Sequence, residues 1–359
     1  MQRLAIIGAG LMGRVLALDA LSAGFHVTLF DRDDTSGQKS CAYTAAGMLA
    51  PIAEVEHDDV LIYSWGIESL VRWPQILATL GNDRVWFQQQ GSLIVAFAQD
   101  HQDMLHLRDC LALKLSHLKG NNHPEFEFIR QDTIALLEPE LNPKLSTGLF
   151  FPGEGQVSSD DFLNASAEYL QSHENIDWQD RTEVIEFGEH WLKTAQSDAK
   201  QEYDWVIDSR GLQAKQAVNA FPGLHGVRGE VIHLQAPTVT LNRPVRLIHP
   251  RYSIYVVPRA NHHYVIGASS IESEDFSPPS VQSTLELLSA AYSLHRGFAE
   301  ARILETRVNC RPTLPDHLPK IIYKSGLIHV NGLYRHGYLL APFLSAKIIE
   351  YIKGLASLK

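Results

Sequence analysis

The chain has 359 residues, more than the roughly 100–200 of a usual single domain, so its length favours two domains or one elaborated domain. Its 31 Lys and Arg residues against 41 Asp and Glu residues give a net charge of −10, which argues against nucleic acid or an acidic membrane surface as a partner. A hydrophobic content of 45% and a charged content of 20% are ordinary for a globular protein and exclude a disordered or collagen-like chain.

The number of cysteines and the hydropathy of the sequence indicate the cellular compartment of the protein. Its three cysteines, Cys41, Cys110 and Cys310, are odd in number and far apart, unlike the dense set of a secreted disulfide scaffold. The most apolar stretch, residues 4–30, is interrupted by glycines and charged side chains and falls short of the ~20 apolar residues that a membrane helix needs. We therefore expect a cytoplasmic protein without membrane insertion.

The first 31 residues have the pattern of a strand–helix–strand unit. Residues 4–7 form a short apolar run, typical of a strand buried in a parallel sheet. A glycine-rich segment, 8–13, follows, and the apolar residues within 15–21 suit a helix. Residues 26–30 predict a second strand, which ends at Asp31.

Each glycine of this unit has a mechanical role in binding a dinucleotide. Gly8 makes the tight turn, Gly10 lets the backbone approach a pyrophosphate, and Gly13 lets the helix pack closely on the strand. The helix N-terminus supplies unpaired N–H groups that favour a phosphate. Asp31, 23 positions after Gly8, can accept hydrogen bonds from a ribose, and its charge disfavours a 2′-phosphate. This predicts NAD or FAD, with Leu11, Met12 and Arg32 as further contacts.

A run of small residues, 40–51, favours a flavin-binding domain over a nicotinamide-binding domain. A simple nicotinamide-binding domain would continue after Asp31 with another helix and strand, whereas this run lets the backbone lie against a flat ring system. The alternative is a surface loop that leads into the helix holding Tyr63.

At this point the sequence resembles the D-amino-acid oxidase family of flavoproteins, and within it the glycine oxidases of thiamine biosynthesis. Four separated matches, in the family's order, cover nearly the whole chain. They are the glycine fingerprint; Ala45-Ala46-Gly47-Met48-Leu49-Ala50-Pro51; Tyr255-Val256-Val257-Pro258-Arg259 with Gly267-Ala268; and Arg311-Pro312 with Tyr334-Arg335-His336-Gly337-Tyr338-Leu339-Leu340-Ala341-Pro342.

The resemblance implies an α/β chain, α+β overall, with a Rossmann-type FAD-binding domain interleaved with an antiparallel-sheet substrate domain. The patterns agree, since residues 85–98, 227–235 and 253–268 predict sheet strands and residues 204–208 predict a buried parallel strand. Residues 327–330 predict the strand before Arg335. The implied divisions are 1–84, 156–222 and 305–359 for the FAD-binding domain, and 85–155 and 223–304 for the substrate domain.

The resemblance also assigns catalytic residues. Arg311 matches the arginine that grips the substrate carboxylate, which a guanidinium binds through two parallel hydrogen bonds. From the residues alone, a surface ion pair explains Arg311 equally well. Tyr255 matches a tyrosine that reaches the carboxylate or closes the pocket, although a strand tyrosine also packs simply in a sheet. Arg335 matches a second arginine beside flavin and substrate.

The implied cofactor is FAD, and no metal is expected, because the pairs His101/His106 and His262/His263 lack helical ligand spacing. Arg14 is expected to face solvent, and Cys41 to be a buried inert thiol. The implied FAD-binding residues are Gly8, Gly10, Leu11, Met12, Gly13, Asp31, Arg32, Ala45, Ala46, Gly47, Met48, Val184, Gly211, Leu333, Tyr334, Arg335, His336, Gly337, Tyr338 and Leu339.

The implied reaction is oxidation of glycine or another small amino acid, with oxygen as electron acceptor. Two alternatives stay open: a D-amino-acid dehydrogenase that passes electrons to a quinone or a protein, and a flavin-bound partner or maturation protein without turnover. The departures from the family pattern are Arg210 before Gly211, Cys310 before Arg311, and Leu333 where a histidine is common. They leave the substrate open, and a homo-oligomer is left open too.

Overall fold

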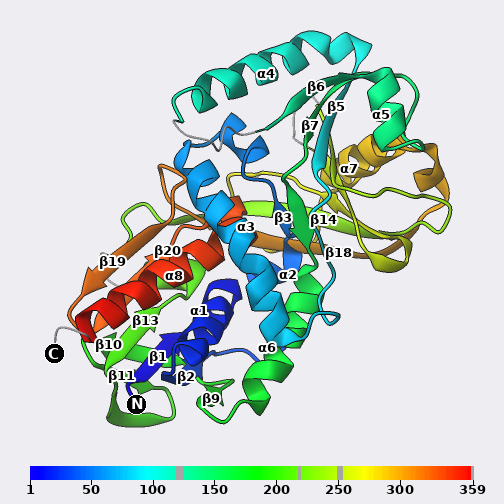
Figure 1. The fold of residues 1–359 in the computed structure, drawn as a ribbon. Helices are drawn as coiled ribbons and strands as arrows, with labels where there is room; N and C mark the ends of the chain where they lie inside the picture. The colour runs from blue at the N-terminus through cyan, green and yellow to red at the C-terminus, as the bar shows by residue number, and fades with distance from the viewer. Residues whose placement is uncertain (119–124, 217–219, 249–253, 357–359) are drawn as a thin grey trace.

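Two large sheets organise the computed structural model, which describes residues 1–118, 125–216, 220–248 and 254–356 (Figure 1). The first sheet has six strands in the order β19-β20-β13-β1-β2-β9, all parallel except β19. The predicted strand–helix–strand unit is confirmed as β1, α1 and β2. The strands are β1 (Arg3–Ile7), β2 (His26–Phe30), β9 (Ile176–Gln179), β13 (Trp205–Asp208), β19 (Lys320–Lys324) and β20 (Leu327–Asn331).

Successive side chains of β1 point to opposite faces of the six-stranded sheet, and both faces are covered. Leu4 and Ile6 belong to a core with helices on one face, while Ala5 and Ile7 face a small sheet on the other. Both faces are therefore buried, as the continuous apolar run predicts. The helices are α1 (Leu11–Ser22), α3 (Leu61–Leu80) and α8 (Gly337–Ala356), which pack on one another, and the small sheet is β10 (Val184–Gly188), β11 (Trp191–Thr194) and β12 (Ser197–Glu202).

The second large sheet has eight strands in the order β18-β14-β17-β16-β15-β5-β7-β6. Its pairs are antiparallel, as expected, except that β5 and β15 run parallel. Alternating residues of β5 again enter different cores, Leu93 and Val95 with α7 (Val281–Leu294), and Ile94 and Ala96 with α4 (His101–Leu115). The strands are β5 (Ser92–Phe97), β6 (Glu127–Arg130), β7 (Leu145–Phe151), β14 (His225–Gln235), β15 (Val245–Leu247), β16 (Ile254–Pro258), β17 (His263–Gly267) and β18 (Arg302–Thr313).

Short elements and one strong ion pair join the two halves. Arg307 of β18 donates to both carboxylate oxygens of Asp160, at 2.6 and 2.9 Å, and to the carbonyl oxygen of Tyr43 at 2.6 Å. The joining elements are α2 (Cys41–Thr44), α6 (Ser159–Ser172) and the sheet of β3 (Met48–Leu49), β4 (Phe87–Gln88) and β8 (Gly155–Val157), while α5 (Gln131–Leu137) packs on β7.

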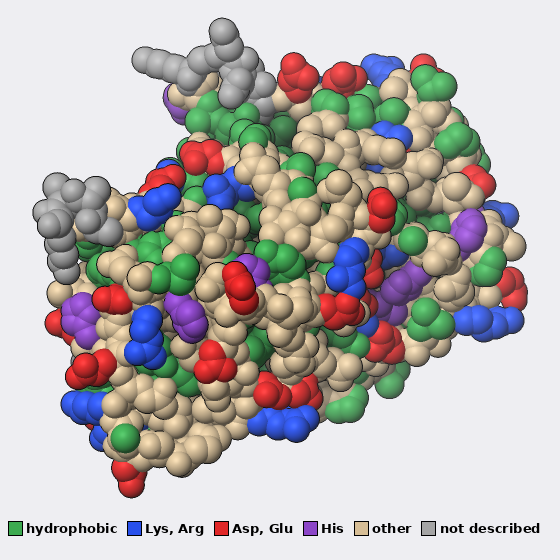
Figure 2. Space-filling view, turned by 60° about the horizontal axis from the view of Figure 1, so that its bottom comes forward, with side chains coloured by type: hydrophobic (Ala, Val, Ile, Leu, Met, Phe, Trp, Pro, Cys, Tyr) green, Lys and Arg blue, Asp and Glu red, His purple; other side chains and the backbone are tan. Residues whose placement is uncertain are grey.

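The strands of the two sheets alternate along the chain, which fits an interleaved layout; the exact domain limits stay a prediction. The expected strand start at Ser253 lies outside the described residues. Among the described ranges, no helix is both long and apolar enough to cross a membrane. Figure 2 shows acidic and basic side chains interspersed over the visible face, rather than gathered by sign.

Candidate active site

One cavity of about 590 Å³ is lined by residues from both large sheets. This volume lies within the usual range for cofactor and ligand sites. The glycine loop after β1, the small-residue run 45–48 and the loop before α8 line it together with strands β14, β16 and β18. The two halves of the molecule therefore share one binding site.

The glycine loop forms a cradle that larger residues would fill. Gly8 has a φ of +99°, and a Cβ added to Gly13 would overlap the carbonyl oxygen of Gly8. Helix α1 starts at Leu11 without a side-chain cap, so its first N–H groups are open to an anion. Asp31 ends β2 and accepts from the N–H of Ala9 at 2.6 Å, and burial raises the pKa of Asp31.

The small-residue run 45–48 lies against β8 and is held there by hydrogen bonds. Gly47 has a φ of +63°, and an added Cβ would overlap the carbonyl oxygen of Val157. The N–H of Val157 donates to the Gly47 carbonyl oxygen at 2.9 Å, and Arg259 donates to that of Ala46. This fixed backbone, with its small side chains, leaves a flat wall to which a ring system fits.

Arg311 stands in the cavity with neutral partners. Its guanidinium donates to the backbone carbonyl oxygens of Arg228, at 3.3 Å, and Ser269, at 3.2 Å. No carboxylate of the described residues forms an ion pair with it. A cation without an anionic partner in a cavity is suited to an anionic ligand. Gly229 opposite provides the room, since a Cβ there would clash with the guanidinium of Arg311.

Tyr255 lines the same part of the cavity, over Gly267, where an added Cβ would lie 2.7 Å from the tyrosine ring. Burial raises the pKa of Tyr255, while the charge of Arg311 opposes that rise and the charge of Glu54 adds to it. The Tyr255 hydroxyl therefore remains a neutral hydrogen-bonding group.

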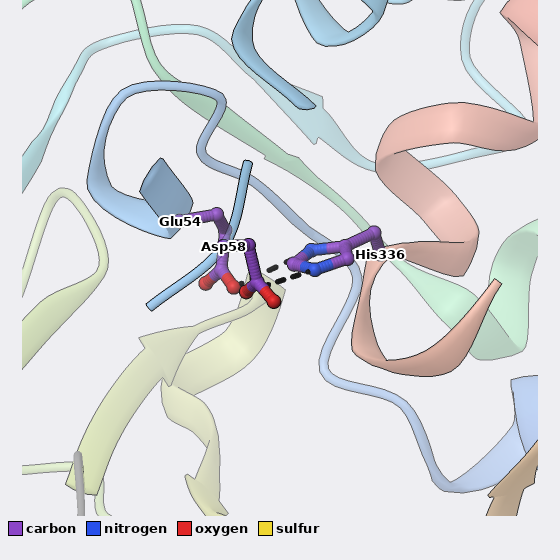
Figure 3. A group of neighbouring side chains, drawn as sticks. All are labelled: Glu54, Asp58 and His336. Atoms are coloured by element: carbon purple, nitrogen blue, oxygen red, sulfur yellow. Dashed lines mark ion pairs between the residues drawn. The ribbon is translucent and has the colours of Figure 1, made fainter. Parts of the chain in front are cut away.

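Arg335 contacts an ion cluster that the sequence did not reveal, and Figure 3 shows the Glu54, Asp58 and His336 side chains of this cluster. Arg335 donates from Nη2 to Asp58 Oδ2 at 2.6 Å, and its Nε lies 2.8 Å from Glu54 Oε2. His336 lies between the two acids, 3.4 Å from Glu54 and 3.1 Å from Asp58. Burial favours a higher pKa for Asp58, but the hydrogen bond from His336 and the charge of Arg335 outweigh it and hold that pKa well below its usual range.

Glu54, Asp58 and His336 offer three ligand atoms within 4.8 Å of one another, an arrangement open to a metal ion. The guanidinium of Arg335, however, already contacts both carboxylates. The positive charge of Arg335 therefore lies against both acids.

The structure gathers the predicted site residues with one exception. Gly13 serves the packing of α1 instead of lining the cavity, and the part that the others play in binding stays a prediction. Sequence reasoning missed Glu54, His57 and Arg246, which line the cavity too. The predicted residues that line it are Gly8, Gly10, Leu11, Met12, Asp31, Arg32, Ala45, Ala46, Gly47, Met48, Val184, Gly211, Tyr255, Arg311, Leu333, Tyr334, Arg335, His336, Gly337, Tyr338 and Leu339.

One expectation about this region is wrong: Arg14 is fully buried instead of facing solvent. Its guanidinium donates to the carbonyl oxygens of Ala9 at 2.8 Å, Leu163 at 2.5 Å and Thr35 at 2.7 Å. It therefore ties the glycine loop to α6 and to the segment after β2. Two buried carbonyl groups and one partly buried carbonyl group require a donor here, and the long side chain supplies it.

Comparison with known proteins agrees with this geometry. The family model described as FAD dependent oxidoreductase (DAO) matches residues 3–351. A putative thiamine biosynthesis oxidoreductase, ThiO, of Rhizobium etli is 36% identical over 346 residues, covering 96% of this chain and 95% of that protein. The glycine oxidase of Pseudomonas aeruginosa is 23% identical over 98% of this chain and 95% of its own length.

The fold is also that of solved proteins. The structure of glycine oxidase from Bacillus cereus superposes with a TM-score of 0.83 at 21% identity, covering 99% of this chain and 95% of that one. The cavity's uncapped helix, buried carboxylate and flat wall fit the diphosphate, ribose and ring of one dinucleotide. The chain belongs to the DAO family of FAD dependent oxidoreductases, and its cofactor is FAD.

Proposed function

We propose that this enzyme oxidises glycine or another small amino acid with a primary or secondary amine. The single observation that carries the proposal is Arg311, a cavity-lining cation whose side-chain hydrogen bonds go to backbone carbonyl oxygens. The names of the Rhizobium and Pseudomonas relatives support the same class of reaction. The ThiO relative also supports a role in thiamine biosynthesis.

The chain's own residues bind and orient the substrate. Arg311 holds the α-carboxylate through charge-assisted hydrogen bonds, and the Tyr255 hydroxyl donates a further one. These contacts would fix the orientation of the α-carbon within the cavity that the run 45–48 and the residues 333–339 also line. The run 45–48 and the residues 333–339 would hold the FAD ring system, which would supply the acceptor for a hydride from the α-carbon.

The product side follows from the chemistry of the substrate. Loss of hydride from the α-carbon of a neutral amine would give a protonated imine, which water hydrolyses to an oxo acid, ammonia or an amine, and a proton. The hydride and the released proton together carry two electrons and two protons, which oxygen as the final acceptor would take up as hydrogen peroxide. Stopped-flow reoxidation by oxygen, compared with a quinone, checks the acceptor, and faster reoxidation by the quinone would favour a dehydrogenase.

Anaerobic bleaching of the flavin absorbance tests the proposal. Glycine, sarcosine or a small D-amino acid is expected to bleach the holoenzyme, while Arg311→Ala retains FAD and requires about 100-fold more amino acid for half-maximal bleaching, because a charge-assisted contact is lost. A yellow protein that no amino acid bleaches would show that the chain binds flavin without this turnover. An unchanged substrate dependence in Arg311→Ala would remove Arg311 from the site.

A further inference from the structure

Glu54 is a cavity-lining acid that the proposed reaction has not used. It lies on the 3₁₀ helix Ala53–Glu56, which follows the small-residue run. Figure 3 shows the Glu54 and Asp58 carboxylates and the His336 ring turned toward one another. Glu54 and His336 line the cavity and come from two segments far apart in the sequence, while Asp58 does not line it.

The two oxygens of Glu54 have different surroundings. Oε2 is buried and lies 2.8 Å from Arg335 Nε and 3.4 Å from His336 Nδ1. Oε1 receives no hydrogen bond from any residue in the described part of the chain. Burial favours a higher pKa for Glu54, but the charges of Arg335 and His336 outweigh it and lower that pKa. Glu54 therefore presents an ionised carboxylate with one oxygen available to a ligand.

Arg335 is oriented by this arrangement toward protein acids rather than toward a substrate. Its Nη2 donates to Asp58 and its Nε pairs with Glu54, so two of its donor groups are engaged. Asp58 is 1% exposed in its side chain and does not line the cavity. Asp58 and His336 thus hold Arg335 and Glu54 in place from behind.

Groups of opposite charge line the cavity together with Tyr255. Arg311, Glu54 and Tyr255 all line it, Arg311 from β18, Tyr255 from β16 and Glu54 from the 3₁₀ helix. One cavity therefore contains a cation with neutral partners and an acid with a free oxygen. This pair complements a zwitterion, whose carboxylate and ammonium groups lie two bonds apart on one carbon.

We propose that Glu54 binds the amino group of the substrate, and that Arg335, His336 and Asp58 are positioning residues that hold it. The proposal rests on the proposed function and narrows it. The site selects acids that carry an α-amino group over hydroxy acids and simple carboxylic acids. A neutral amine donates to Glu54 Oε1, and an ammonium group binds there more strongly still.

Glu54→Gln in the holoenzyme, with two matched ligands, tests this assignment. The ligands are glycine and acetate, which share a carboxylate and differ in the amino group. The anaerobic change in flavin absorbance gives the affinity for each. Glu54→Gln is expected to weaken glycine about tenfold or more and to leave acetate within about twofold, since only the contact to the amine is lost. Glu54→Asp, which keeps the charge, should restore part of the affinity for glycine.

Asp59→Asn is the matched control. Asp59 is exposed, lies five residues from Glu54 and does not line the cavity, so the same change from acid to amide should alter neither ligand. FAD content and melting temperature show that each variant is folded. An equal loss of glycine and acetate affinity in Glu54→Gln, or no loss of either, overturns the assignment. Ligand binding is read from the flavin spectrum, so the test of Glu54 does not require that glycine is oxidised. Binding of glycine without oxidation would contradict the proposed function and leave the assignment of Glu54 intact.

Discussion

Glu154 is a fully buried carboxylate that anchors the segment carrying Glu54. It accepts from the N–H groups of Ile52 and Ala53, at 2.9 and 2.8 Å, and from the hydroxyl of Ser92. These bonds tie the start of the 3₁₀ helix to strand β5 of the eight-stranded sheet. Burial raises the pKa of Glu154 to about 7, even though all three donors oppose the rise.

This pKa gives stability a specific dependence on pH. A carboxyl group whose pKa is raised from 4.5 to about 7 holds its proton more tightly in the folded state, so stability is lost as pH rises between these values. The side chain in Glu154→Gln stays neutral at every pH. The variant should therefore lose about 3 kcal/mol less than the wild type in its free energy of unfolding as pH rises. Urea denaturation of both proteins at pH 5 and pH 8 measures it. Equal pH dependence in wild type and variant would contradict the buried titration.

Sequence patterns identified the residues whose signal is local. The glycine loop, the run 45–48 and the loop 333–339 are contiguous motifs, and each lines the cavity as expected. Glu54 and Asp58 were missed because their partners are remote: Arg335 lies 277 positions from Asp58. A charge cluster of this kind exists only after folding, and no spacing rule in the sequence describes it.

At the scale of elements, Arg14 connects helix α1 to α6. It has no carboxylate partner among the described residues, and burial lowers its pKa to about 10. Arg14→Met would leave the carbonyl oxygens that it binds without a donor, and each buried unsatisfied group costs about 1–3 kcal/mol. We expect a loss of about 3 kcal/mol or more in the free energy of unfolding and weaker FAD retention.

Denaturant unfolding and the absorbance of released flavin measure both effects. Arg84→Met is the matched control, because Arg84 is 48% exposed and pairs with Glu168 at the surface, where such a pair contributes about 1 kcal/mol or less. A loss in Arg14→Met no larger than that of the control would show that the buried guanidinium is not needed.

Elements with a strong local period were predictable, and pairings between distant segments were not. Strands β1, β2, β13 and β20 follow the buried apolar runs in the sequence. The parallel pairing of β15 with β5 joins residues about 150 positions apart, and neither strand carries a sign of its partner. The prediction that Arg14 faces solvent was wrong for a related reason. A charged residue on a helix is usually exposed, unless backbone carbonyl groups from distant segments accept its hydrogen bonds.

For the whole molecule, the net charge of −10 makes attraction of an amino acid a local matter. A zwitterion is neutral overall, so the acidic surface neither draws it in nor repels it strongly. Selection therefore rests on paired charges inside the cavity, Arg311 for the carboxylate and, as we propose, Glu54 for the amine. Raised salt should then change the Michaelis constant little, because buried pairs are weakly screened.

The shared cavity also makes FAD a structural link between the two halves. A ligand that binds only the folded state stabilises it by about 4 kcal/mol when its free concentration is 1,000 times its dissociation constant. Apoprotein is therefore expected to melt about 5 °C or more below the holoenzyme, and added FAD should restore the difference. Riboflavin should restore less, because it lacks the diphosphate and adenosine that the N-terminus of α1 and Asp31 would bind. Differential scanning calorimetry measures these melting temperatures. Equal values with and without FAD would mean that direct contacts such as Arg307 with Asp160 hold the two halves together. Full rescue by riboflavin would place the binding energy at the ring instead of the glycine loop.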